Sequence, residues 1–263
     1  MMSDDVMSRP ARQPDRTEVT GPEQTDVYDV FEPDPHRARG YTVALVHGGF
    51  WRPTHDRTHL GPLAEALSRD GFHVVNLEYP RIGMPGGGWP GTADALLANL
   101  VAAHADTDLP DAVVLVGHSA GGHLVTWLAS EDRVPDLLGA VALGPVADLA
   151  TADRLHLGDD AARAFLGGSP DEVPDAWAAA DPGRQRLTAP VALVSGEHDD
   201  VVPPEVAEAY AATRTEDDAK ATTALARGAD HFDLVDPEHP AYLLLLAEVE
   251  ELTLGRGGPH HPA

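Results

Sequence analysis

The sequence predicts an α/β protein built on a doubly wound, mostly parallel sheet. Short runs rich in β-branched and apolar residues alternate along the chain with longer segments that have helical spacing of apolar residues. Gly71, Gly117 and Gly196 stand at the joins between these segments, where the chain must turn. Regular alternation of this kind is typical of parallel strands that are connected by helices packed on both faces.

The expected elements follow from this pattern in chain order. Several of the strand candidates are almost entirely apolar, as expected for strands covered on both faces. Strands are expected over residues 26–31, 41–46, 73–77, 112–116, 138–143, 191–194 and 221–226. Helices are expected over residues 58–68, 92–103, 120–129, 204–212 and 237–252.

The chain of 263 residues is expected to form one folded domain over residues 21–254. Residues 145–187 do not follow the strand–helix rhythm, and we interpret them as a small cap excursion over the site. The polar, proline-containing residues 1–20 are expected to form a disordered N-terminal arm, and residues 255–263 a flexible tail.

Composition excludes several classes of function. The formal net charge of −25 disfavours nucleic acid and acidic lipid surfaces as partners. No apolar run reaches the roughly 20 residues of a membrane span, and the first residues do not resemble a secretory signal, so a cytoplasmic location is expected. The absence of cysteine excludes disulfides and thiolate catalysis. The sequence leaves open whether the acidity reflects genome composition or adaptation to high salt, and whether the chain forms a homodimer.

The strongest motif is Gly117-His118-Ser119-Ala120-Gly121, a G-x-S-x-G pattern. It directly follows an expected strand and begins an expected helix, which is the context that the motif requires for a nucleophilic serine. The helix N-terminus there favours developing negative charge. We therefore predict that Ser119 is the nucleophile, although a serine in an ordinary turn is the alternative.

A second motif, His47-Gly48-Gly49-Phe50-Trp51, follows the expected strand 41–46. A tetrahedral intermediate needs preorganised N–H donors, and a glycine-rich loop can turn its amides inward. We predict that the amides of Gly49, Phe50 and Ala120 form the oxyanion hole. The alternative is a simple turn with buried aromatic residues.

The acid and the base of a catalytic triad are expected on two later loops. Asp199 and Asp200 follow the expected strand 191–194, and we favour Asp199 as the acid that orients the base. His231 follows the last expected strand and is the predicted base, with His239 as the fallback. The chain order Ser119, Asp199, His231 is the order used by one class of serine hydrolases.

These motifs, with the run Gly117-His118-Ser119-Ala120-Gly121-Gly122-His123-Leu124 and Asp230-His231-Phe232-Asp233, resemble the α/β-hydrolases. Within that fold they look like the kynurenine formamidase (arylformamidase) branch, whose oxyanion motif is H-G-G-x-W, and are similar to neighbouring short-chain and carbohydrate esterases. The resemblance spans about residues 25–252 and implies an α/β-hydrolase fold. The residues expected to contact substrate lie in or beside the motifs: Trp51, Arg52, Arg81, Trp89 and His118.

The sequence therefore predicts a serine hydrolase that cleaves a small acyl ester or an activated amide such as an N-formyl arylamine. No cofactor or metal is expected, since the histidines are scattered and no H-E-x-x-H motif occurs. Two alternatives stay open. One is a receptor or scaffold that has lost catalysis, and the other is a small dipeptidase, because a chain of this length leaves no room for the added domain of large oligopeptidases.

Overall fold

A computed structural model describes residue 6 and residues 9–254, and its centre is an eight-stranded sheet in the order β1-β2-β4-β3-β5-β6-β7-β8. The first two pairings of that order are antiparallel and the others are parallel. The strands are β1 (Arg16–Val19), β2 (Val27–Phe31), β3 (Thr42–Val46), β4 (His73–Leu77), β5 (Val113–His118), β6 (Leu137–Leu143), β7 (Val191–Gly196) and β8 (Ala221–Ala226). The predicted fold class, a mostly parallel doubly wound sheet, is confirmed.

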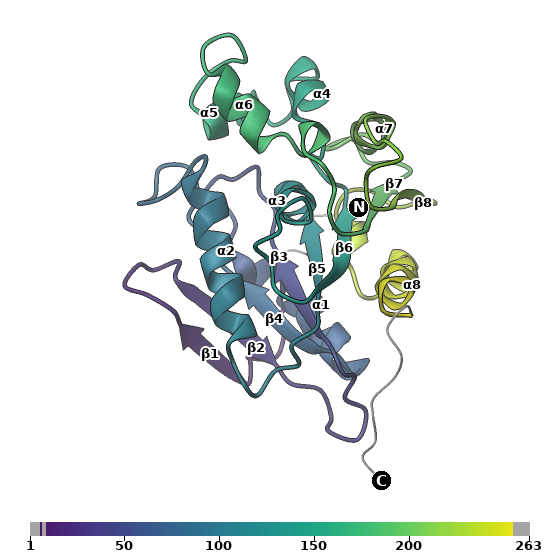
Figure 1. Cartoon of the computed structure of the whole chain (residues 1–263). Coiled ribbons are helices and arrows are strands. Elements are labelled where there is room, and N and C mark those ends of the chain that lie inside the picture. The colour runs from purple at the N-terminus through teal and green to yellow at the C-terminus, as the bar shows by residue number, and fades with distance from the viewer. Residues whose placement is uncertain (1–5, 7–8, 255–263) are drawn as a thin grey trace.

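Helices cover both faces of the sheet (Figure 1). One hydrophobic core lies under α2 (Gly91–His104), α3 (Ala120–Leu128) and α7 (Glu205–Ala212). The other lies under η2 (Arg57–Leu60), α1 (Gly61–Arg69) and α8 (Ala241–Thr253), the last preceded by η4 (Asp233–Val235). Every residue of β2, β3 and β5 is buried, which explains why these strands are apolar in sequence without strict alternation.

The segment between β6 and β7 forms three short helices and one 3-10 turn. They are α4 (Leu149–Arg154), α5 (Ala161–Leu166), α6 (Pro174–Ala180) and η3 (Pro182–Arg184). Figure 1 shows α4, α5 and α6 grouped at the top of the molecule, beyond the end of the sheet. Their apolar residues, including Phe165, Leu166 and Trp177, join the same core as α2 and α3. We call residues 145–187 the cap.

The N-terminal arm differs from the expectation of disorder up to residue 20. Arg16–Val19 forms β1, which pairs antiparallel with β2 at the edge of the sheet. Its side chains alternate between half-buried and exposed, so the strand has no apolar run to mark it in the sequence. The tail that we expected over residues 255–263 lies outside the described residues.

Candidate active site

Ser119 lies in a strained turn between β5 and α3. Its backbone has φ 56° and ψ −116°, a left-handed conformation that a non-glycine residue adopts only under constraint. The turn is tight because Gly121 lies against the carbonyl groups of Val46 and His47, where a Cβ atom would overlap with backbone. The local sequence therefore presents the Ser119 side chain at the N-terminus of α3, directly beyond the carboxyl end of β5.

Asp199 and His231 form a buried hydrogen-bonded pair on two neighbouring loops. His231 Nδ1 lies 2.7 Å from Asp199 Oδ2, and the two residues are 2% and 5% exposed. The other carboxylate oxygen of Asp199 accepts hydrogen bonds from the amides of Val201, at 3.0 Å, and Val202, at 2.7 Å. Because a carboxylate only accepts hydrogen bonds, this geometry places a proton on Nδ1 and leaves Nε2 free to act as a base.

Of the two adjacent carboxylates, Asp199 is the one that contacts His231, whereas Asp200 is exposed. His239, the fallback base, lies beside Asp233 instead, with its Nε2 3.9 Å from a carboxylate oxygen.

Two contacts bring this pair next to the serine turn. His118, which directly precedes Ser119, donates from Nε2 to the carbonyl oxygen of His231 at 3.0 Å, and the two rings lie 4.5 Å apart. Ser119 donates its amide to Leu143 O at 2.8 Å. The next residue, Gly144, is so close to the pair that a Cβ atom there would lie 2.9 Å from His231 Nδ1 and 3.0 Å from Asp199 Oδ2.

The predicted oxyanion loop lies directly against Ser119. A Cβ atom at Gly48 would lie 2.9 Å from Ser119 Cβ. Within the described part of the chain, the amides of Gly49 and Phe50 donate to no protein acceptor, and both residues have positive φ, 108° and 49°. The amide of Ala120 opens α3, where no intrahelical acceptor exists. None of the three predicted donors therefore has a protein acceptor among the described residues.

The cap is fastened to this loop. The ring of Phe50 lies so close to Gly158 that a Cβ atom there would be 2.7 Å from the ring. The Arg52 guanidinium donates to the carbonyl oxygens of Gly158 and Asp159. Gly158, Asp159 and Asp160 are consecutive left-handed residues with φ between 53° and 59°. Two of these are not glycine, so tertiary contacts must maintain the turn.

Three of the expected substrate contacts lie elsewhere than the sequence suggested. Trp51 is only 1% exposed, and its ring stacks on Phe165 at 4.5 Å inside the core. Arg81 is buried, with its guanidinium bonded to His55 O at 2.7 Å and paired with Glu78 at 3.2 Å. His118 braces the His231 loop, as described above. The periodicity of a sequence does not report such side-chain directions.

The other two expected contacts retain partial exposure. Trp89 is half-buried and packs edge-on against Trp127 at 5.1 Å and Phe165 at 6.2 Å, so it lies between α3 and the cap. Arg52 is also half-buried, and the partners of its guanidinium among the described residues are backbone carbonyl oxygens.

Sequence reasoning did not single out Glu78, which follows β4. It is 2% exposed and contacts His47 of the oxyanion motif, with 2.9 Å between His47 Nε2 and Glu78 Oε1. A signal was present, because a carboxylate that follows an apolar strand at the carboxyl edge of the sheet lies where functional groups gather.

His59 lies beside His47 of the oxyanion loop, and its burial gives the protein a testable pH dependence of stability. It is 8% exposed, and neither ring nitrogen has a hydrogen-bond partner in the region that the structure describes. Burial, with the nearby His47 and His55, lowers the pKa of His59 to about 3. In the unfolded chain the His59 imidazole takes up a proton near pH 6.5, whereas in the folded protein it stays neutral until about pH 3. The free energy of unfolding therefore decreases as the pH falls from 6.5 towards 3.

We expect His59→Leu to reduce the loss of melting temperature between pH 7 and pH 5. The residue accounts for about 2 kcal/mol over that interval, or several degrees in a chain of this size. Burial lowers the pKa of His123 to about 4 in the same sense, whereas burial beside Asp148 raises the pKa of Asp181 to about 6 and acts in the opposite sense. Thermal melts of wild type and His59→Leu at pH 7 and pH 5 test this prediction. If the difference in melting temperature between the two pH values is the same in both proteins, His59 is not the group responsible.

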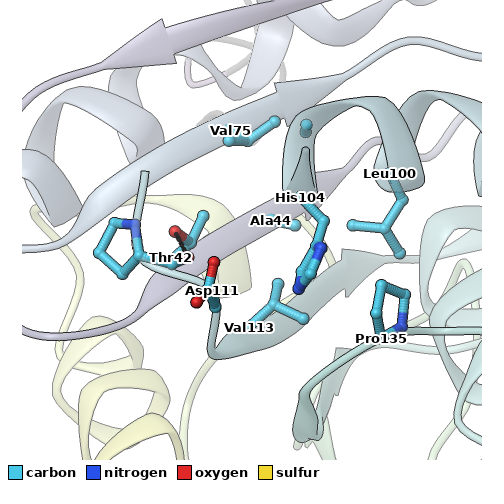
Figure 2. A pocket seen from close by; sticks show the side chains of 10 residues that line it. Thr42, Ala44, Val75, Leu100, His104, Asp111, Val113 and Pro135 are labelled. Carbon is cyan, nitrogen blue, oxygen red and sulfur yellow. Dashed lines mark hydrogen bonds between the residues drawn. The ribbon is translucent and has the colours of Figure 1, made fainter. Parts of the chain in front are cut away.

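A separate cavity lies at the amino-terminal ends of strands β3 and β5 (Figure 2). It is lined mainly by apolar side chains, together with His104 and Asp111, and includes the first residues of β3 and β5, Thr42 and Val113. Ser119 follows the last residue of β5, so the length of a six-residue strand, about 20 Å, separates the two places. This cavity is therefore no part of the candidate active site.

Two further properties concern the described residues only. They contain no group of three or more His, Asp or Glu side chains arranged to hold a metal ion. None of their helices has both the length and the apolar composition to cross a membrane.

The fold places the chain in a known class of structures. It resembles esterase B from Lactobacillus rhamnosis with a TM-score of 0.75 at 18% identity, over 95% of this chain and 89% of that one. A truncated carbohydrate esterase from gut microbiota gives a TM-score of 0.75 at 15% identity, over 92% and 99%. Esterase 2 from Thermogutta terrifontis, phosphonylated by sarin, gives 0.72 at 18% identity, over 92% and 95%. The protein therefore has the α/β-hydrolase fold.

The sequence comparison is more specific. Residues 94–243, more than half of the chain, match the prolyl oligopeptidase family. The chain belongs to this family. No sequence of a curated protein matches it.

Proposed function

We propose that the protein is a serine hydrolase that cleaves small acyl esters or activated amides through an acyl-enzyme. The observation that carries this proposal is the buried Asp199–His231 pair beside a strained Ser119. A hydrogen-bonded carboxylate and imidazole next to a serine at a strand-to-helix turn is the arrangement that activates a hydroxyl as a nucleophile. The esterases that share the fold, one of them phosphonylated by sarin, support the same class.

The reaction follows from these groups. Ser119 Oγ attacks the acyl carbon while His231 Nε2 takes the hydroxyl proton, and Asp199 stabilises the resulting imidazolium. The amides of Gly49, Phe50 and Ala120 donate to the oxyanion. The leaving alcohol or amine receives the proton from His231. Water, deprotonated by the same imidazole, then hydrolyses the acyl-Ser119 ester and regenerates the hydroxyl.

A substrate panel tests the proposal and separates its finer forms. The purified protein is assayed with p-nitrophenyl esters of two to eight carbons, with N-formylkynurenine and with dipeptide p-nitroanilides. Fastest turnover of acetyl or butyryl esters supports a short-chain carboxylesterase, and fastest turnover of N-formylkynurenine supports an arylformamidase. No turnover of any ester or amide contradicts the proposal and favours a non-catalytic scaffold.

Arg52 is the side chain on which the formamidase form depends. Formylkynurenine carries an α-carboxylate, and Arg52 is a half-buried cation beside the oxyanion loop that has only carbonyl partners among the described residues. We expect Arg52→Ala to raise KM for formylkynurenine about tenfold, because a charge-assisted bond is lost, and to spare p-nitrophenyl acetate. Arg81→Ala is not a clean test, since Arg81 is buried against Glu78. Equal effects of Arg52→Ala on both substrates, or none on either, remove this argument for a formamidase.

A dipeptidase is the second candidate, and the family match favours it. The same Ser119, Asp199 and His231 would cleave a peptide bond by the same steps. A peptidase must also bind a charged peptide terminus, so p-nitroanilide dipeptides with free and blocked N-termini distinguish this activity from plain ester hydrolysis. A strict requirement for the free amine together with weak esterase activity favours the dipeptidase.

A further inference from the structure

A buried network that the proposed mechanism does not use lies beneath the oxyanion loop. His47, the first residue of the loop motif, is fully buried, and its ring stacks on Tyr79 with 4.1 Å between ring centroids. Its Nε2 lies 2.9 Å from Glu78 Oε1, and its Nδ1 lies 2.9 Å from the carbonyl oxygen of Gly48. Both ring nitrogens therefore face oxygen acceptors.

Both bonds form together only when both nitrogens of His47 carry protons. The doubly protonated ring is a cation, and in a buried position it needs a counter-charge. Glu78 supplies that charge. Although burial raises the pKa of the Glu78 carboxyl, the hydrogen bond and charge of His47, the amide of Tyr79 and the guanidinium of Arg81 hold it below its usual value.

Among the described residues, every polar partner of the Glu78 carboxylate is a donor. Besides His47, its oxygens accept from the amide of Tyr79 at 2.9 Å and from the amide of Arg57 at 3.2 Å. The guanidinium of Arg81 lies 3.2 Å away and that of Arg57 lies 3.7 Å away. A carboxylate satisfies every one of these contacts, whereas an amide side chain would set an NH₂ group against a donor in either orientation.

The Gly48 carbonyl shares its peptide plane with the amide of Gly49. In a trans peptide the C=O and N–H groups point in opposite directions, so a carbonyl held on the side of His47 turns the Gly49 N–H away from the buried network. Tyr79 reinforces the arrangement, since its hydroxyl donates to His47 O at 2.7 Å. Complete burial, with the charge of Glu78, raises the pKa of Tyr79 well above 10, so the hydroxyl keeps the proton that it donates.

We propose that Glu78 is a positioning residue that acts through His47, with Tyr79 in support, to aim the Gly49 amide at the oxyanion formed on Ser119. The inference rests on the proposed hydrolase function and deepens it. Glu78 does not touch substrate; it fixes the peptide whose N–H would do so.

Three proteins test the inference: wild type, Glu78→Gln and Asp29→Asn. Asp29 is the matched control because it is a buried carboxylate, 6% exposed, that bonds the guanidinium of Arg57 at 2.7 Å in the same network. Among the described contacts it makes none to His47. Removal of one oxyanion donor costs about 10²–10³ in kcat, so for a misaligned donor we expect Glu78→Gln to lower kcat for p-nitrophenyl acetate about 10–100-fold. KM should change less than about threefold, because the ground-state carbonyl makes weaker use of the donors.

A purely structural role gives a different set of results. A structural role predicts that Glu78→Gln and Asp29→Asn lose similar amounts of kcat when their melting temperatures fall equally. It also allows kcat and KM of Glu78→Gln to change together. Either result overturns the inference, as does a soluble Glu78→Gln with normal kcat. The pH–rate profile adds a check, since the inference predicts a lower plateau with an unchanged midpoint.

A second variant serves if Glu78→Gln does not fold. Tyr79→Phe removes only the hydroxyl that holds His47 O, and we expect kcat to fall about tenfold with KM unchanged. A folded Tyr79→Phe with normal kcat overturns the inference. Failure of the proposed function looks different: the wild type itself then turns over no acyl substrate.

Discussion

Ser119→Ala is expected to abolish turnover of every acyl substrate while leaving the fold intact. Removal of the nucleophile in a comparable triad lowers kcat about 10⁶-fold, and the residual rate comes from the oxyanion hole and binding. The substitution deletes one oxygen from a residue that is 3% exposed, and the strained turn is maintained by the close backbone approach of Gly121. We therefore expect the turn to persist in the variant.

The measurement is kcat for the best ester of the panel, with circular dichroism and a thermal melt to show that the variant is folded. Alanine at a left-handed position has no greater steric conflict than serine, so the melting temperature should remain within a few degrees. A folded variant that retains wild-type turnover would remove Ser119 from the mechanism and the acyl-enzyme with it.

The second large effect separates two neighbouring carboxylates. Asp199→Asn is expected to lower kcat about 10⁴-fold, as in triads where the acid fixes the histidine tautomer. Asparagine can turn its NH₂ group towards His231 Nδ1, which moves the ring proton to Nε2 and removes the lone pair that serves as the base in the proposed mechanism. In the other orientation the NH₂ group faces the amides of Val201 and Val202, which are themselves donors.

Asp200→Asn is the matched control, since it makes the same chemical change one residue further along an exposed stretch of the loop. We expect its kcat to remain within about twofold of wild type, as for most surface substitutions away from a site. Rates of ester hydrolysis for both variants show which of the two substitutions lowers kcat more. The reverse ranking would transfer the orienting role to Asp200 and contradict the observed pair.

The sequence predicted the central strands of the sheet well because they are buried on both faces. Val43, Val114 and Val141, for example, are completely buried, and no polar requirement interrupts such runs. β1 escaped prediction because an edge strand with half-exposed Arg16 and Glu18 has no apolar pattern. The cap helices α4 and α5 have six residues each, too few to show helical periodicity.

The candidate site was predictable where backbone geometry dictates residue type. The turn at Ser119 requires glycine at position 121, and the oxyanion loop has positive φ at Gly49, so both leave a motif in the sequence. Side-chain direction leaves no such mark. Trp51 follows the same loop but packs into the core, and Arg81 turns inward to Glu78, because the tertiary packing of the cap and of β4 decides both.

Covalent labelling shows directly whether Ser119 is an activated nucleophile. The protein is incubated with a fluorophosphonate, its intact mass is measured, and the modified peptide is sequenced. We expect one adduct per chain, located on Ser119, absent from Ser119→Ala and formed far more slowly in Asp199→Asn, because phosphorus is attacked by the same activated hydroxyl. An unmodified protein, or an adduct on another residue, would contradict the assignment of Ser119, Asp199 and His231 as a working triad.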